Sequence, residues 1–283
     1  MRVLTLTAFC VIFSALSLAQ TTKPTPDAAM IAEQNKKIEA ENAAIQKAIT
    51  DGTLAYREKR YSDAIVSFDK GLAISPENSA VFTLNKSLAL NARAVDRYNT
   101  AVHAKDAVAR DSGIAAAKRD WTAAAAAINE AYLSAKDPNG NGQRSLPGIL
   151  KQRAEILRFV LTKIDMTQSD TVIAAYREYL AIEADRAERS QAQLRLGNAL
   201  AQIGENAKAL REFEALMLDS PLNYEAMFGA ASSLLALQER KNYQRSADLF
   251  KRYLHFAPAT DERRSEAQTW LNFLKDEGIV PKP

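Results

Sequence analysis

Apolar residues recur at steps of three and four along most of the chain, which is the spacing of amphipathic helices. The clearest stripe lies between residues 114 and 135 and consists of Ile114, Ala117, Trp121, Ala124, Ile128, Ala131 and Ala135. No run of alternating Val, Ile or Thr is bounded by hairpin turns, so the pattern does not predict strands. The hydrophobic pattern therefore predicts an all-α fold.

One spacing of small, aromatic and proline residues occurs twice, with the same offsets of twelve, four and eight residues. Its members are Gly52, Ala64, Phe68 and Pro76 in one copy and Gly197, Ala209, Phe213 and Pro221 in the other. We expect the small residues to let two helices approach, the aromatic ring to fill the gap toward the next hairpin, and the proline to end the second helix. An internal repeat of this kind predicts an array of helical hairpins.

The segments 52–76 and 196–210 resemble the tetratricopeptide repeat (TPR) family, whose unit is a helix-turn-helix of about 34 residues. The resemblance implies a right-handed superhelical α-solenoid in which the first helices of successive hairpins line a concave groove. A looser third copy contains Gly229, Tyr243, Ser246, Phe250 and Pro258. Its turn is about five residues longer than in the other copies.

The pattern of repeats and breaks divides the chain into nine expected segments. They are a signal peptide over 1–19, a linker over 20–26, an N-terminal helix with a partial heptad pattern over 27–50, TPR-like repeats over 45–78 and 224–259, an elongated helical hairpin over 79–136, a degenerate TPR-like hairpin over 148–184, a TPR repeat over 190–223 and a capping helix over 260–276. In the elongated hairpin, the first predicted break is Asp111-Ser112-Gly113. On the capping helix, we expect Trp270, Leu271 and Phe273 to cover the apolar end of the stack, or else to contact a partner.

The first nineteen residues have the features of a secretory signal: Arg2, a short apolar stretch over 3–18, and small residues before a cleavage point. We therefore expect export, to a bacterial periplasm or out of the cell, with no stable membrane span after the signal is removed. The only cysteine, Cys10, lies in the removed segment. The mature chain would then contain no disulfide.

The charges of the chain are nearly balanced. The whole chain has 37 basic and 34 acidic residues, so that 37 − 1 = 36 basic residues remain when Arg2 is removed, and the two signs are interspersed. Nucleic acid is therefore not expected as a partner.

The predicted N-terminal helix has half of a heptad pattern, and Asp27 is its expected N-cap. Ile31, Ile38 and Ile45 lie seven residues apart, but the positions that would complete a coiled-coil seam are Gln34, Glu41 and Ala48. One interpretation is an extended capping helix, and the other is a homo-oligomer formed through a short coiled coil. The layout of signal, heptad helix and repeats resembles exported proteins that pair with the Tol and outer-membrane assembly machinery.

Candidate chemistry is sparse along the chain. The segment 137–142 matches the opening of a calcium-binding EF-hand loop, but its twelfth position, which should be a bidentate Glu, is Gly148, so a plain loop is favoured. His103 and His255 have no Cys, Asp or Glu at metal-ligand spacing, and Tyr253 and Phe256 beside His255 indicate packing.

Acidic residues such as Glu155, Asp165 and Glu183 are expected to be ordinary solvated helix residues. No nucleophile motif or phosphate-binding glycine loop occurs. We therefore predict no enzyme activity, no cofactor and no metal site.

The resemblance to TPR proteins implies which residues line the groove. Matching the best two copies gives Gln46, Ile49, Thr53, Tyr56 and Arg57 in one, and Gln191, Leu194, Asn198, Ala201 and Gln202 in the other. Family members that grip the C-terminal carboxylate of chaperones use Lys, Arg and Asn here, and only Asn198 and Arg57 fit, so chaperone tails are not expected.

Two functions follow from these observations. The first is a non-enzymatic exported scaffold that recruits other envelope proteins or peptides through its groove. The alternative is a ligand carrier or enzyme with a pocket formed by the non-standard central hairpins, residues 79–165.

Overall fold

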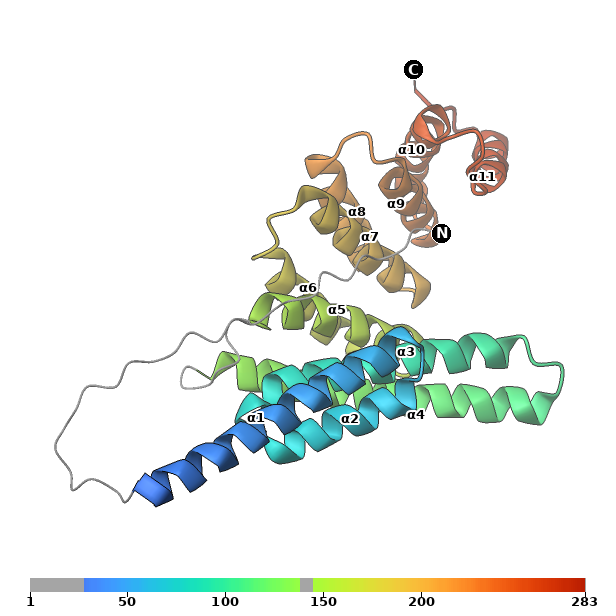
Figure 1. Cartoon of the computed structure of the whole chain (residues 1–283). Helices are drawn as coiled ribbons and strands as arrows, with labels where there is room; N and C mark the ends of the chain where they lie inside the picture. The colour runs from blue at the N-terminus through green and yellow to red at the C-terminus, as the bar shows by residue number, and fades with distance from the viewer. Residues whose placement is uncertain (1–27, 138–144, 283) are drawn as a thin grey trace. The chain divides into compact units, whose positions relative to one another are not determined.

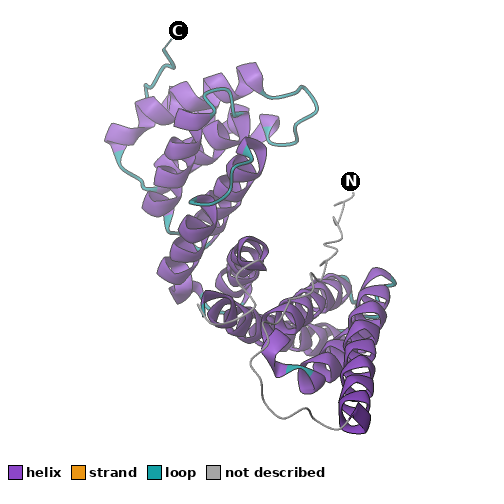
Figure 2. Cartoon of the chain, turned by 60° about the vertical axis from the view of Figure 1, so that its left-hand side comes forward, coloured by secondary structure: helices purple, strands orange, loops and turns teal. Residues whose placement is uncertain are grey.

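The computed structural model describes residues 28–137 and 145–282, which form eleven α-helices, three short 3-10 helices and no strand (Figures 1 and 2). The predicted all-α fold is confirmed. The expected signal peptide, the linker and the N-cap residue Asp27 lie outside the described residues. None of the helices within them combines the length and the hydropathy that a bilayer crossing requires.

Helix bounds follow the chain in this order: α1 Ala28–Arg57, α2 Tyr61–Ile74, η1 Pro76–Asn78, α3 Ser79–Val102, α4 Ala107–Lys136, α5 Leu146–Lys163, η3 Met166–Gln168, α6 Ser169–Leu180, α7 Arg186–Gln202, α8 Asn206–Asp219, α9 Tyr224–Ala236, η4 Arg240–Asn242, α10 Tyr243–Phe256 and α11 Arg264–Asp276. α2, α8 and α10 each end two residues before a proline of the repeat pattern, as expected for a residue that cannot continue a helix.

The described residues divide into two units, with the boundary between Ala43 and Ala44. In the described part of the first unit, α1 exposes Ile31 and Ile38. In the second unit, Ile45 packs beside a core cluster that includes Ala55 and Phe68.

Within the second unit, from α2 onward, each α-helix packs against the one that follows it, and α3 and α4 share the longest contact (Figure 1). The first helices of successive hairpins also touch: α3 contacts α5, α5 contacts α7, and α7 contacts α9. We call the surface formed by α3, α5, α7 and α9 the first-helix face. It is the surface on which residues of different hairpins come together.

The repeated glycines make room for an aromatic ring. A Cβ atom added to Gly197 would lie 2.6 Å from the ring of Phe213, and one added to Gly229 would also collide with that ring. Phe68 lies against Gly52 in the same way. We expected each repeated glycine to let the backbone of the second helix come close. In the structure, the space beside the glycine is instead filled by the phenylalanine ring of the second helix. Phe213 therefore joins α7 of its own hairpin to α9 of the next.

The third repeat differs from its predicted alignment. Gly229 makes room for the ring of Phe213, which belongs to the preceding hairpin. It therefore does not have the role in the third repeat that Gly52 and Gly197 have in the first two. The corresponding position belongs to Ala231, whose carbonyl oxygen accepts a hydrogen bond from Ser246 Oγ at 2.9 Å. The longer connection of this hairpin is residues 237–242, which include η4.

The predicted break at 111–113 is wrong. α3 ends at Val102 and α4 begins at Ala107, capped by Asp106, whose carboxylate accepts a hydrogen bond from the backbone N–H of Ala109 at 2.7 Å. Gly113 lies inside α4, where an added Cβ would stand 2.7 Å from the Cβ of Ala101 on α3. The glycine permits close helix packing instead of ending a helix.

The last helix covers the stack with only part of the predicted set. Ala267 and Leu274 of α11 are fully buried and Leu271 is half-buried against the core, whereas Trp270 and Phe273 are exposed. Of the three residues expected to cover the stack, Leu271 packs against the core and the ring of Phe273 lies 6.4 Å from that of Tyr243 on α10, while Trp270 and Phe273 also stay partly open to solvent.

Candidate binding surface on the first helices

The predicted groove residues fall into two separate groups. On α1, Gln46 and Arg57 are exposed, while Ile49, Thr53 and Tyr56 are half-buried, and Ile49 and Tyr56 pack beside Phe68. On α7, the side chains of Gln191, Asn198 and Gln202 are exposed and Ala201 is half-buried. Because α3 and α5 stand between α1 and α7 in the array, the two groups do not form one site.

Leu194 does not lie on the exposed side of α7. Its side chain is buried in the main hydrophobic core together with Leu196 and Leu200 of the same helix. Leu194 therefore anchors α7, while Gln191, Asn198 and Gln202 form an exposed polar row on that helix.

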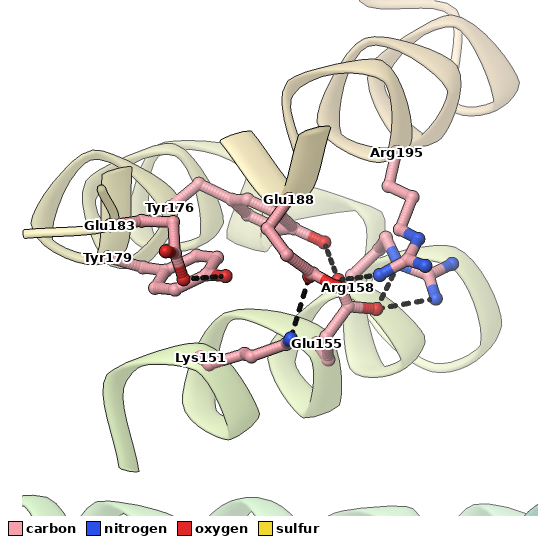
Figure 3. Close-up of polar contacts among 8 residues, drawn as sticks. All are labelled: Lys151, Glu155, Arg158, Tyr176, Tyr179, Glu183, Glu188 and Arg195. Carbon is pink, nitrogen blue, oxygen red and sulfur yellow. Dashed lines mark hydrogen bonds and ion pairs between the residues drawn. The ribbon is translucent and has the colours of Figure 1, made fainter. Parts of the chain in front are cut away.

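Glu155 on α5 is the centre of a polar network that joins three helices (Figure 3). Its carboxylate accepts hydrogen bonds from Arg158 at 3.0 Å, from Arg195 of α7 at 3.2 Å and from the hydroxyl of Tyr176 of α6 at 3.0 Å. Only 17% of the Glu155 side chain is exposed. The expectation that Glu155 is a solvated helix residue is thus wrong.

Further polar contacts lie beside this network (Figure 3). Lys151 of α5 pairs with Glu188 of α7 at 2.7 Å, and the hydroxyl of Tyr179 donates to Glu183 at 2.8 Å. Glu183 also accepts from the backbone N–H of Asp185, at 2.9 Å, and these hydrogen bonds lower the pKa of the Glu183 carboxyl. Asp165 likewise accepts from Thr167 and Gln168. These acids are fixed by local hydrogen bonds.

Burial raises the pKa of the Tyr176 hydroxyl, and the neighbouring Glu155 carboxylate raises it further. A raised pKa in the folded state stabilises the fold below the unfolded-state pKa of about 10, and this contribution is lost as the pH rises above that value. We therefore expect Tyr176→Phe to make the free energy of unfolding less dependent on pH above about pH 10. Urea unfolding midpoints measured across the alkaline range test this, and an unchanged pH dependence would contradict it.

A second buried carboxylate, Asp120 of α4, holds two arginines of α3. Arg93 donates to both of its oxygens, at 2.9 and 2.7 Å, and Arg97 donates at 2.7 Å. Arg93 also reaches Ser62 Oγ, close to the start of α2, at 3.0 Å. This centre therefore links α2, α3 and α4.

Aromatic rings connect the two carboxylate centres. Trp121 of α4 stacks on Phe159 of α5 with ring centroids 5.5 Å apart, and it also contacts Tyr98 of α3 at 5.5 Å. The guanidinium of Arg158 lies 4.6 Å above Phe159, and the ammonium of Lys163 lies 4.7 Å above Tyr98. We call this set the arginine–aromatic band; it comprises Arg97, Tyr98, Arg158, Phe159, Lys163 and Arg195.

Sequence reasoning missed the arginine–aromatic band. Arg93 and Arg97 lie one helical turn apart and so share a face of a helix, which is the weak signal that the sequence offered, because an acid placed between them would pair with both. The acid that does so, Asp120, sits in an alanine-rich stripe beside Trp121.

The histidines and the EF-hand-like loop are the remaining chemical candidates, and the described part of the chain does not bring them together into a site. It contains no cluster of three or more His, Cys, Asp or Glu side chains suited to a metal. His103 and His255 are exposed. Residues 138–144 of the loop that resembles an EF-hand lie outside the described residues, and Gly148 lies in the first turn of α5 after Pro147.

The central hairpin is filled by its own side chains. Ala117, Ala124, Ile128 and Ala131 are fully buried between α4 and its neighbours. This filling is what a structural hairpin requires, and it gives no support to the alternative of a ligand carrier or enzyme with a pocket in residues 79–165.

Comparisons with known proteins identify the fold. No model of a known protein family matches the chain, and no curated protein matches it. The crystal structure of YrrB, described as a TPR protein with an unusual peptide-binding site, superposes with a TM-score of 0.50 at 14% sequence identity, covering 84% of this chain and 98% of that one. The TPR domain of P58(IPK) gives a TM-score of 0.36 at 13% identity, covering 89% and 71% of the two chains. The likeness to YrrB shows that this chain has the fold of a TPR α-solenoid.

Proposed function

We propose that this protein is a non-enzymatic scaffold that binds other proteins or peptides on its first-helix face. The observation that carries the proposal is the division of α7. Leu194, Leu196 and Leu200 fix this helix in the core, while Gln191, Asn198 and Gln202 form a polar row on its exposed side. The peptide-binding site named for YrrB supports the same use of this fold.

The proposed setting is the bacterial cell envelope, and it rests on the signal-like sequence of residues 1–19. Export would make envelope proteins the available partners. Self-association through α1 would rest on Ile31 and Ile38, since Ile45 is partly covered by its own hairpin. Sedimentation velocity of the protein tests it, and a monomer at micromolar concentration would exclude a stable oligomer.

A capture experiment tests the scaffold function. The purified protein retains partners from an envelope fraction, and mass spectrometry identifies them. The variant Gln191→Ala/Asn198→Ala/Gln202→Ala removes the polar row without loss of helix propensity, and we expect it to retain fewer of those partners.

The matched control is Gln268→Ala/Thr269→Ala/Asn272→Ala, which removes three exposed polar side chains from α11. It should retain the same partners as the unaltered protein. Capture that is equal for all three proteins, or lost equally in both variants, would contradict binding on the first-helix face.

A further inference from the structure

Two carboxylates, Asp120 of α4 and Glu155 of α5, are each shared by two arginines. Asp120 binds Arg93 and Arg97, and Glu155 binds Arg158 and Arg195. One negative charge can balance only one of two positive charges. Each centre therefore carries an excess of one positive charge.

In each centre, one of the two arginines is more exposed than the other: Arg97 beside Asp120 and Arg195 beside Glu155. The exposed side-chain fraction is 40% for Arg97 against 22% for Arg93, and 42% for Arg195 against 23% for Arg158. Arg97 and Arg195 each contact their carboxylate through a single terminal nitrogen. A guanidinium has five N–H donors in a planar fork, so donors are left that face solvent.

Lys163 adds a third positive charge at the end of α5, the helix that contacts both α3 and α7. Its ammonium lies over the ring of Tyr98 at the α3 side, while Arg158 lies over Phe159 on α5. The neighbouring acid Glu188 is already paired with Lys151 at 2.7 Å. The outer groups Arg97, Lys163 and Arg195 thus lie on α3, α5 and α7 and, together with Arg93 and Arg158, carry more positive charge than Asp120 and Glu155 balance.

We propose that the arginine–aromatic band binds an extended acidic segment of a partner protein, with Arg97, Lys163 and Arg195 pairing with its carboxylates. The inference rests on the proposed scaffold function and names the chemistry of the partner. Packed helices lie about 10 Å apart, so the band from α3 to α7 spans about 20 Å, or about six residues of extended chain. A carboxylate fits the free edge of each guanidinium, and the rings provide apolar surface between the charges.

The probe is a fluorescein-labelled peptide of about ten residues in which Glu alternates with Ser, long enough to cross the band. Fluorescence anisotropy at low ionic strength measures its binding to the purified protein. We expect saturable binding that weakens with added salt, and at least about tenfold weaker binding to the variant Arg97→Gln/Arg195→Gln. Arg93 and Arg158 still hold Asp120 and Glu155 in this variant, so its circular dichroism spectrum should be unchanged.

The control variant Lys70→Gln/Arg211→Gln removes the same charge from exposed positions on the second helices α2 and α8, and it should bind the peptide normally. Equal weakening in both variants would overturn the proposal, because it would show a general charge effect. Equal binding of a peptide with Gln in place of Glu would also overturn it, and so would tighter binding of a single-stranded oligonucleotide of equal charge.

The two proposals can fail separately. Should the acidic peptide fail to bind while partner capture still depends on Gln191, Asn198 and Gln202, the partner chemistry would be wrong and the scaffold function would stand. Should capture also be independent of those residues, both proposals would fall.

Discussion

Replacing Phe213 with alanine is expected to destabilise the repeat array by about 3 to 5 kcal/mol, the range for truncating a fully buried aromatic side chain. The ring of Phe213 is 0% exposed and lies against both Gly197 and Gly229. Glycine has no side chain that could move into the space left by the ring, so the cavity would stay open. Urea unfolding followed by circular dichroism measures the loss.

The matched control for this prediction is Leu218→Ala on the same helix, α8. Its side chain is 83% exposed, and we expect a change within about 0.5 kcal/mol. A loss below about 1 kcal/mol for Phe213→Ala would show that the neighbouring helices move together and close the cavity. The contact between α7, α8 and α9 would then be less rigid than its packing indicates.

The second large effect is expected for Arg93→Ala, at about 3 kcal/mol, because the buried Asp120 would lose the arginine that binds both of its oxygens. Arg97→Ala should cost less than about 1 kcal/mol, since the Arg97 side chain is 40% exposed and contributes one hydrogen bond. The free energy of unfolding of the two variants is compared under the same conditions.

The double variant Arg93→Ala/Asp120→Ala separates the loss of the Arg93 contact from the burial of a carboxylate that keeps only the single hydrogen bond of Arg97. It should be more stable than Arg93→Ala alone, because no carboxylate is then left short of a partner. Equal losses for Arg93→Ala and Arg97→Ala would contradict the distinction between an inner and an outer arginine.

The sequence predicted the repeat architecture because the small and aromatic residues of a hairpin lie close together along the chain. Gly52 with Phe68 and Gly197 with Phe213 were found by spacing alone. Gly229 was misassigned because its partner ring belongs to the preceding hairpin. The break at 111–113 was misplaced because Gly113 is also a residue that lets α4 approach Ala101 of α3, and local propensity does not distinguish these two uses.

The candidate site was predicted less completely. Position within a repeat assigned Gln191, Asn198, Gln202 and Leu194 to the groove; the first three side chains are exposed on α7, and Leu194 is buried. The carboxylate centres were missed because their partners are distant in sequence: Asp120 lies 27 and 23 residues from Arg93 and Arg97, and Arg195 lies 40 residues from Glu155. Only the packing of α3 against α4 and of α5 against α7 reveals which charges are shared.

Phe213 lies between two glycines of different hairpins, and this position limits where the chain can be divided into fragments that fold. A fragment that ended at Pro221 would remove Gly229 and turn the ring of Phe213 toward water, while a fragment that began there would expose the empty surface of α9. The boundary between one repeat and the next in the amino-acid sequence is therefore not a boundary at which the molecule divides into self-sufficient pieces. Exchange of single hairpins between related arrays would have to carry α9 along with α7 and α8.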